Sequence, residues 1–205
     1  MGLGKGIRQL GSSRHAEHER QKHDYYATDP KVIEDIFRKE SFKDDVWECA
    51  CGEGHLSKKM KEHGKNVYST DLIDRGYGDD FFDFLEDNPH NKTEKDIITN
   101  PPYKLAKEFV EKSLDLQIKG CKTAMFLKIQ FLESLSRIEL FKKHPPKKIY
   151  VYSKRQKCVI NGNENISGNS AMCYAWFIWE KGYSGDTNLS WIFPKKYRDK
   201  QEVLL

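Results

Sequence analysis

The sequence has few of the features that mark secreted, metal-binding or membrane proteins. It contains five cysteines in 205 residues, an odd number with no Cys-x-x-Cys pair, which disfavours a disulfide framework and a zinc site. No apolar run approaches the roughly 18 residues that cross a bilayer. The first ten residues hold Lys5 and Arg8 but no apolar segment typical of a signal peptide. We therefore expect a cytoplasmic protein with reduced thiols, no metal and no membrane contact.

Acidic residues are absent from one long segment. Residues 141–160 contain seven Lys/Arg and no Asp/Glu, whereas residues 71–96 contain nine acidic and three basic residues. The net charge of +4 is therefore unevenly distributed along the chain. This asymmetry favours one face that binds a polyanion, although charge clusters also occur on ordinary solvated surfaces.

The length suits one domain with a full hydrophobic core. Residues 1–24 are polar and include glycines and three histidines, so we expect a flexible basic arm there. Residues 25–193 form the expected folded domain. Residues 194–205, which include Lys-Lys-Tyr-Arg, form a basic tail.

Apolar strands and amphipathic helices alternate through the first three quarters of the chain. Asp29-Pro30 predicts a helix start with Asp29 as N-cap. The hydrophobic pattern predicts strands at 46–47, 66–70, 96–99 and 123–127 and helices at 56–63, 104–119 and 131–143. The strand expected near Tyr77 is weak because that segment is short and acidic.

The pattern changes after residue 147. Lys148–Ile160 and Ala171–Trp179 are apolar strands separated by a Gly/Asn-rich loop, which predicts an antiparallel hairpin. We therefore predict an α/β fold with a doubly wound, mostly parallel sheet and a C-terminal antiparallel hairpin.

Two strand ends carry residues typical of ligand sites, which lie beyond the carboxyl ends of strands in open α/β sheets. Gly52 and Gly54, within Glu-Cys-Ala-Cys-Gly-Glu-Gly, allow a sharp turn and close approach to a ligand. The next strand ends at Asp71, whose carboxylate can accept hydrogen bonds from ribose hydroxyls. Gly-x-Gly alone is a weak signal, because strand-end loops also carry glycine simply to turn.

The segment Asn100-Pro101-Pro102-Tyr103 at the next strand end is more specific. An exocyclic amino nitrogen is a poor nucleophile because its lone pair is delocalised into the ring. Acceptors such as the Asn100 side-chain oxygen and the Pro101 carbonyl can draw that nitrogen toward tetrahedral geometry. The prolines stiffen the loop, and Tyr103 offers a flat face on which an extruded base can stack.

Two other interpretations of this segment remain open. It can be a simple Pro-Pro turn, with Asn100 as a cap and Tyr103 as a packing residue. Pro-Pro-Tyr is also a ligand of WW domains, although a strand–helix junction would bury it. The two ligand-type strand ends that precede it favour catalysis.

With these motifs in this order, the chain resembles the class I S-adenosylmethionine-dependent methyltransferases. Within them it is similar to the amino-group DNA methyltransferases with an Asn/Asp-Pro-Pro-Tyr/Phe motif, and most to the small versions carried by phages and prophages. The resemblance covers residues 24–193. It implies a Rossmann-like catalytic domain, S-adenosyl-L-methionine as cofactor, Asn100 to Tyr103 as catalytic residues and N6 of adenine in DNA as the target.

The resemblance also implies cofactor-binding residues. A Thr-Pro-Pro-like segment, here with Tyr26 and Thr28, would touch the amino-acid end of the cofactor, although Asp29 departs from the usual proline. Asp80 and Phe81 would meet the adenine, with the register uncertain by one because Asp79 and Asp83 are close. The glycine-loop and ribose positions are Glu48, Cys49, Ala50, Gly52, Gly54, Asp71 and Leu72.

The substrate is less firmly implied than the chemistry. Lys154, Arg155 and Lys157 are candidate phosphate contacts. No separate target-recognition domain fits in the chain, so recognition must come from the 161–169 loop, the arm, the tail at 195–198 or a partner chain. Enzymes that methylate RNA bases or a protein glutamine amide share Asn-Pro-Pro-Tyr, and a catalytically silent nucleic-acid-binding module is the remaining alternative.

Overall fold

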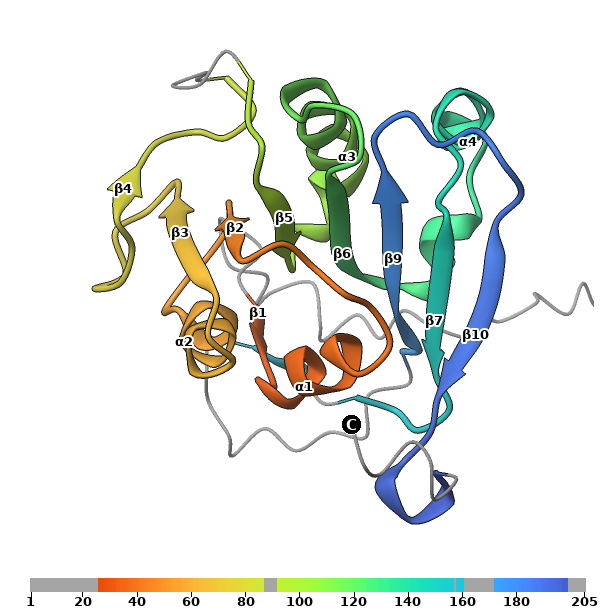
Figure 1. Ribbon diagram of the computed structural model, residues 1–205, viewed down its shortest axis with the longest axis horizontal. Coiled ribbons are helices and arrows are strands. Elements are labelled where there is room, and N and C mark those ends of the chain that lie inside the picture. Colours follow the sequence, from red (N-terminus) through yellow and green to blue (C-terminus); the bar gives the residue numbers. More distant parts are fainter. Residues whose placement is uncertain (1–25, 87–91, 157, 161–171, 199–205) are drawn as a thin grey trace, which may run out of the picture.

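An eight-stranded sheet forms the centre of the protein in the computed structural model, which describes residues 26–86, 92–156, 158–160 and 172–198. Its strand order is β10-β7-β9-β6-β5-β2-β3-β4 (Figure 1). The strands are β2 (Asp45–Glu48), β3 (Asn66–Asp71), β4 (Asp80–Phe81), β5 (Asp96–Thr99), β6 (Lys122–Lys128), β7 (Lys148–Tyr152), β9 (Tyr174–Glu180) and β10 (Asn188–Ile192). All adjacent pairs are parallel except those that β9 makes with β6 and β7.

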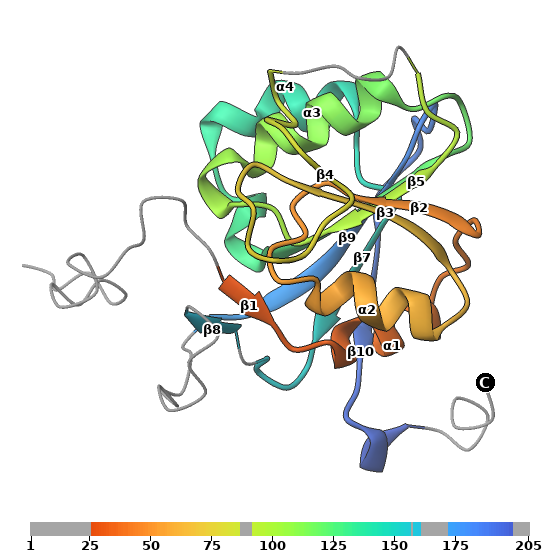
Figure 2. The same ribbon diagram turned by 90° about the vertical axis from the view of Figure 1, so that its left-hand side faces the viewer.

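Helices cover both faces of this sheet. Figure 2 shows α1 (Lys31–Phe37) and α2 (His55–Glu62) on one face and α3 (Ala106–Leu116) and α4 (Ile138–Lys143) on the other. Each face has its own hydrophobic cluster. The arrangement confirms the predicted doubly wound α/β fold. No helix in the described ranges is long and apolar enough to cross a membrane.

The reversed strand β9 joins the two clusters. All of its residues from Tyr174 to Trp179 are buried. Ala175, Phe177 and Trp179 belong to the cluster beneath α3 and α4, whereas the residues between them face the other cluster. Burial on both faces explains why this strand is continuously apolar instead of alternating.

The predicted hairpin is confirmed in part and corrected in part. β7 and β9 are antiparallel neighbours, with Lys148 opposite Ile178. However, the strand predicted at Lys148–Ile160 is interrupted after Tyr152. Its second part, β8 (Cys158–Ile160), pairs instead with β1 (Tyr26–Thr28) in a separate two-stranded sheet. β10 was not predicted, and it extends the main sheet beyond β7.

Other boundaries differ from the predicted ones for local reasons. The weak strand expected near Tyr77 is β4, which begins only at Asp80. The helix predicted at 104–119 starts with a 3-10 turn, η2 (Tyr103–Leu105), and ends at Leu116. The helix predicted at 131–143 is broken into η3 (Ile129–Leu132), η4 (Leu135–Arg137) and α4. The Ser134 hydroxyl accepts from the Ser136 amide and so starts a new turn at the break.

The helix start at Asp29-Pro30 has the predicted geometry. The Asp29 carboxylate accepts a hydrogen bond from the Lys31 amide at 3.0 Å, and the Val32 amide donates to the Asp29 carbonyl. Pro30 already has helical dihedral angles. This cap fixes the direction in which β1 enters the fold, immediately before α1.

Candidate active site

The carboxyl ends of β2, β3 and β5 meet at one edge of the sheet because the three strands are parallel neighbours. This edge carries the glycine loop after β2, Asp71 at the end of β3 and Asn100 directly after β5. The structure therefore brings together the three strand ends that the sequence singled out.

The glycine loop turns through two residues with positive φ. Gly52 has φ 54° and Gly54 has φ 78°, a backbone region that favours glycine. A Cβ atom on Gly54 would lie 2.3 to 2.5 Å from carbon atoms of the Tyr77 ring. Gly54 is therefore required both for its dihedral angles and for the close approach of Tyr77, which sequence reasoning missed as a site residue.

Asp71 holds the glycine loop against the end of β3. Its carboxylate accepts hydrogen bonds from the Gly52 amide at 2.8 Å and the Ile73 amide at 3.0 Å. The Cys51 amide donates to the Thr70 carbonyl beside it. The neighbouring Leu72 is 55% exposed. The predicted ribose-binding carboxylate thus lies at the sheet edge, where its remaining acceptor capacity is available to a ligand.

Glu48 lies below the loop and not on its surface. The side chain is buried and accepts a hydrogen bond from the Ser57 hydroxyl of α2, which in turn is 2.7 Å from the Ser69 hydroxyl of β3. Burial raises the pKa of Glu48 to about 8 against the opposing effect of the Ser57 hydrogen bonds. Glu48 is therefore largely protonated at neutral pH. Its hydrogen bond with Ser57, which lies next to Ser69, connects β2, α2 and β3 in the interior of the protein.

Two cysteines near the loop are packing residues. Cys49 and Cys51 are buried free thiols, and burial raises the pKa of both above that of an ordinary thiol. Ala50 packs against the cluster beneath α3. Cys49 and Ala50 thus pack on the core side of the loop, and their contact with the cofactor stays a prediction.

Asp80 and Phe81 form β4 beside the end of β3. Phe81 is in register with Asp71, and Asp80 is in register with Thr70. Phe81 is 43% exposed. The Tyr68 hydroxyl donates to the Asp80 carboxylate at 2.7 Å, whereas Asp79 is turned back onto the Ser69 amide. Both aspartates are exposed, so the contact of Asp80 and Phe81 with the adenine of the cofactor stays a prediction.

The Asn100 side chain is fixed by a residue far away in the sequence. Its amide nitrogen Nδ2 donates to the Thr28 hydroxyl oxygen Oγ1 at 2.7 Å. Thr28 is buried at the end of β1. The backbone of Tyr26, at the start of the same strand, pairs with Ile160. The structure thus places Thr28 against the catalytic candidate, a contact that the resemblance did not imply.

Tyr103 stands at the start of η2 with one face of its ring beneath a cation. The Lys128 ammonium, at the end of β6, lies 4.4 Å from the centre of the Tyr103 ring. The Tyr174 ring is 6.1 Å away, tilted by 42°. Pro101 is buried and Pro102 has φ −53°, and the Leu105 amide donates to the Pro102 carbonyl. These contacts fix the loop between β5 and α3.

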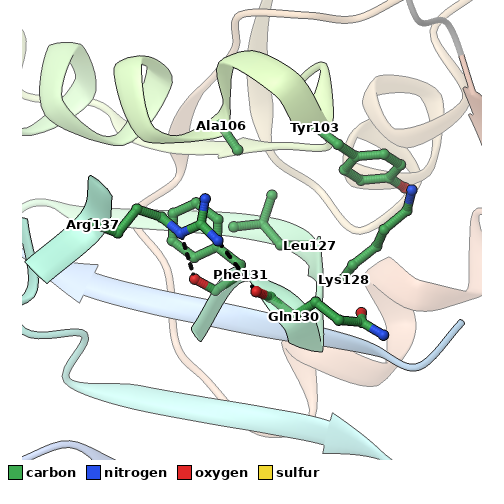
Figure 3. A pocket seen from close by; sticks show the side chains of 7 residues that line it. All are labelled: Tyr103, Ala106, Leu127, Lys128, Gln130, Phe131 and Arg137. Carbon is green, nitrogen blue, oxygen red and sulfur yellow. Dashed lines mark hydrogen bonds between the residues drawn. The ribbon is translucent and has the colours of Figure 1, made fainter. Parts of the chain in front are cut away.

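A pocket of about 170 Å³ opens next to Tyr103 (Figure 3). A cavity of about 150 Å³ is large enough to bind benzene, so this pocket has room for a small flat group. Its lining residues are Tyr103, Ala106, Leu127, Lys128, Gln130, Phe131 and Arg137. Arg137 lies over the Phe131 ring and donates to the carbonyls of Phe131 and Gln130.

Lys128 and Arg137 were not among the predicted site residues. Both lie in the segment that runs from the end of β6 to the start of α4. The position of Lys128 directly after an apolar strand is a signal that could have identified it, because strand ends carry ligand contacts in this fold class. Arg137 carries no comparable signal in the sequence.

The structure describes two of the three predicted phosphate contacts. Lys154 and Arg155 are exposed beyond the end of β7. Lys157, the arm at 1–24 and the 161–169 loop lie outside the described residues. The described part of the tail forms a 3-10 turn, η5 (Lys195–Tyr197).

Solved structures of methyltransferases share this fold. A protein from Listeria monocytogenes, described as a candidate class I S-adenosylmethionine-dependent methyltransferase, is 12% identical with a TM-score of 0.58, over 92% of this chain and 72% of that one. A modification subunit of a candidate type I restriction enzyme from Vibrio vulnificus is 13% identical with a TM-score of 0.56, over 89% and 50%. A candidate RNA methyltransferase from Pyrococcus horikoshii is 12% identical with a TM-score of 0.50, over 77% and 87%.

No protein-family model and no curated protein matches the sequence. The likeness is therefore one of architecture: the chain has the Rossmann-like fold of the class I S-adenosylmethionine-dependent methyltransferases. It spans half the length of the restriction-enzyme subunit. The residues of the site carry the argument about function from here on.

Replacing Gly54 with alanine tests the close packing of the glycine loop. We expect Gly54→Ala to lower the free energy of unfolding by about 2–3 kcal/mol, because it adds a clash with Tyr77 to the cost of positive φ. Gly64→Ala is the matched control: its φ is also +78°, but nothing lies within 4 Å of the added Cβ, so a loss of about 1 kcal/mol is expected. Urea unfolding measures both. Equal losses in the two variants would contradict the predicted contact, and Gly54→Ala/Tyr77→Ala should recover the difference.

The pKa of Glu48 predicts a pH dependence of stability. Because the pKa is raised in the folded protein, Glu48 favours folding at low pH, and this contribution is lost as pH rises from about 4.5 to about 8. Glu48→Gln should remove this slope, which is at most about 1.4 kcal/mol per pH unit. The measurement is urea unfolding from pH 5 to pH 9. Parallel curves for wild type and variant would show that Glu48 is ionised in the folded protein.

Proposed function

We propose that this protein is a methyltransferase that uses S-adenosyl-L-methionine to methylate N6 of adenine in DNA. The observation that carries the proposal is the Asn100–Tyr103 loop. It follows β5 at the ligand-binding edge of a methyltransferase fold, and the Asn100 amide in it is oriented by Thr28.

The residues at the sheet edge fit S-adenosylmethionine. Gly52 and Gly54 let the loop turn sharply through positive φ, and Asp71 supplies a carboxylate for ribose hydroxyls. Exposed Phe81 offers an apolar face beside it for the adenine ring. When bound, the cofactor supplies an electrophilic methyl group on its sulfonium.

The hydrogen bond to Thr28 fixes the orientation of the Asn100 carboxamide. Its Nδ2 donates to Thr28, and its oxygen Oδ1, which is buried in this structure, would accept from the amino group of a substrate that enters the site. With the Pro101 carbonyl as a second acceptor, Asn100 would orient both N–H bonds and direct the nitrogen lone pair toward the methyl group. An acceptor held in place before substrate binds acts without reorganisation cost.

Tyr103 provides the contact for the ring of the substrate. Its aromatic face adjoins a pocket that accepts a small flat group, which suits a base extruded from its stack. Lys128 holds the ring in position through a cation–π contact. A base that enters would stack on Tyr103 and place its amino group near Asn100, three residues earlier in the same loop.

The choice of DNA adenine rests on three observations of different kinds. The basic residues Lys154 and Arg155 are exposed beyond β7. A fold neighbour is the modification subunit of a candidate restriction enzyme. The motif order resembles that of amino-group DNA methyltransferases.

Transfer from radiolabelled S-adenosylmethionine to a panel of substrates tests the proposal. The panel contains single-stranded and duplex DNA, RNA, and a release-factor protein with its glutamine amide. We expect label on DNA, at N6 of adenine after nuclease digestion and chromatography. Label on RNA or protein alone would contradict the substrate, and no label on any acceptor with cofactor bound would favour a silent binding module.

Variants of Asn100 and Thr28 test the mechanism. Asn100→Ala should lower kcat at least about a hundredfold, because it removes an acceptor of the amino group. Thr28→Val should lower kcat by about five- to tenfold with an unchanged KM for the cofactor, because one hydrogen bond that orients Asn100 is lost. Thr28→Ser retains the hydroxyl and is the matched control, which should keep most activity. A raised cofactor KM with an unchanged kcat in Thr28→Val would instead assign Thr28 to cofactor binding.

A further inference from the structure

A surface at the far edge of the sheet combines basic and aromatic side chains from two segments. The Ser153 amide and hydroxyl, just after β7, donate to the Ile192 carbonyl at the end of β10, at 3.1 and 3.2 Å. The two parallel strands therefore end next to each other, before the chain continues toward β8 in one case and into η5 in the other. The exposed side chains that follow these two strand ends, here called the β10 surface, are Lys154, Arg155, Lys195, Lys196 and Tyr197.

The charge of the β10 surface has one sign. Lys154, Arg155, Lys195 and Lys196 are exposed, and neither residues 148–156 nor residues 188–198 contain an acidic residue. Four exposed cations that follow adjacent strand ends favour a polyanionic partner.

An exposed aromatic ring lies beside one of these cations. Tyr197 is 64% exposed, and the Lys196 ammonium is 4.6 Å from the centre of its ring. Exposed rings of this size leave apolar area in water that a partner can cover. Aromatic faces next to cations suit a nucleic-acid strand, whose bases stack on the rings while its phosphates meet the ammonium groups.

The turn that presents Tyr197 is anchored to the body of the protein. Arg198 donates to the Phe193 carbonyl at 2.8 Å and forms an ion pair with the partly buried Asp35 carboxylate of α1, also at 2.8 Å. Asp35 additionally pairs with Arg38. Arg198 therefore ties the end of η5 to α1, and residues 194–198 contain no carboxylate that could pair with the two lysines.

We propose that the β10 surface binds a nucleic-acid strand outside the catalytic pocket and supplies affinity that a target-recognition domain would otherwise provide. This inference rests on the proposed action on DNA. β7 and β10 are parallel to β5 and end at the same edge of the sheet. β10 lies four strand positions from β5, which is about 19 Å at the usual strand spacing. At about 3.4 Å per nucleotide, a strand with its target base at Tyr103 reaches this surface after roughly six nucleotides.

Binding measurements test the surface without using catalysis. Fluorescence anisotropy with 20-nucleotide single-stranded DNA compares the full chain with Lys154→Gln/Lys195→Gln/Lys196→Gln. The charge-matched control is Lys119→Gln/Lys142→Gln/Lys143→Gln, at the opposite edge before β6 and β7, where all three lysines are exposed. We expect the β10-surface variant to raise Kd at least tenfold and to lower the salt slope by about two. The control should change Kd less than twofold.

Equal effects in the two triple variants would overturn the proposal, because net charge alone would then explain the binding. The same holds if the β10-surface variant loses binding to polyglutamate or to phosphatidylserine vesicles as strongly as to DNA. Tyr197→Ala, which keeps the charge, should raise Kd for single-stranded DNA by about tenfold with an unchanged salt slope. An unchanged Kd in Tyr197→Ala would show that stacking on Tyr197 does not contribute to binding.

Kinetics separate this inference from the proposed function. In methyl transfer, the KM of the wild type should be lower for a 20-nucleotide substrate than for a 5-nucleotide substrate, and the β10-surface variant should lose this difference. Selective loss of DNA binding with no transfer to DNA would retain the surface and reject the function. Transfer to DNA with the length effect intact in the variant would retain the function and reject the surface.

Discussion

The parallel alignment of β2, β3 and β5 is the constraint on which the candidate site depends. Each strand has only four to six residues, but reversing one would move its last residue to the opposite edge, about 13–20 Å away. The crossover helices and the two core clusters maintain this alignment. Glu48 contributes to this alignment from below the loop, because its side chain accepts a hydrogen bond from Ser57 of α2, which lies next to Ser69 of β3. Buried side chains thus help to determine the geometry of the site.

Sequence patterns predicted the alternation of strands and helices because burial on one face or both leaves a strong periodic signal. They failed where that signal is weak or the partner is remote. β10 is half-exposed at the sheet edge, so its residues do not alternate clearly. β8 and β1 are three residues each, and their pairing joins opposite ends of the chain. The single helix predicted at 131–143 ignored the capping capacity of Ser134.

The site was predictable to a similar extent. Strand-end positions identified Gly52, Gly54, Asp71 and the Asn100 loop, because position at a strand end is a local property of the sequence. The contact between Asn100 and Thr28 was not predictable, since 72 residues separate them and no periodicity links them. The same is true of Tyr77 on Gly54, because the loop that carries this ring folds back over the turn.

The small sheet of β1 and β8 affects the order in which parts of the protein can form while the chain is being synthesised. Thr28 contacts Asn100, and its strand pairs with residues 158–160, which are synthesised after six of the eight strands of the main sheet. A nascent chain can form the glycine loop, β3 and β5 well before this pairing is possible. The support of the proposed catalytic asparagine therefore depends on a late segment of the chain, and only β9, which lies between β6 and β7, and the edge strand β10 are synthesised later still.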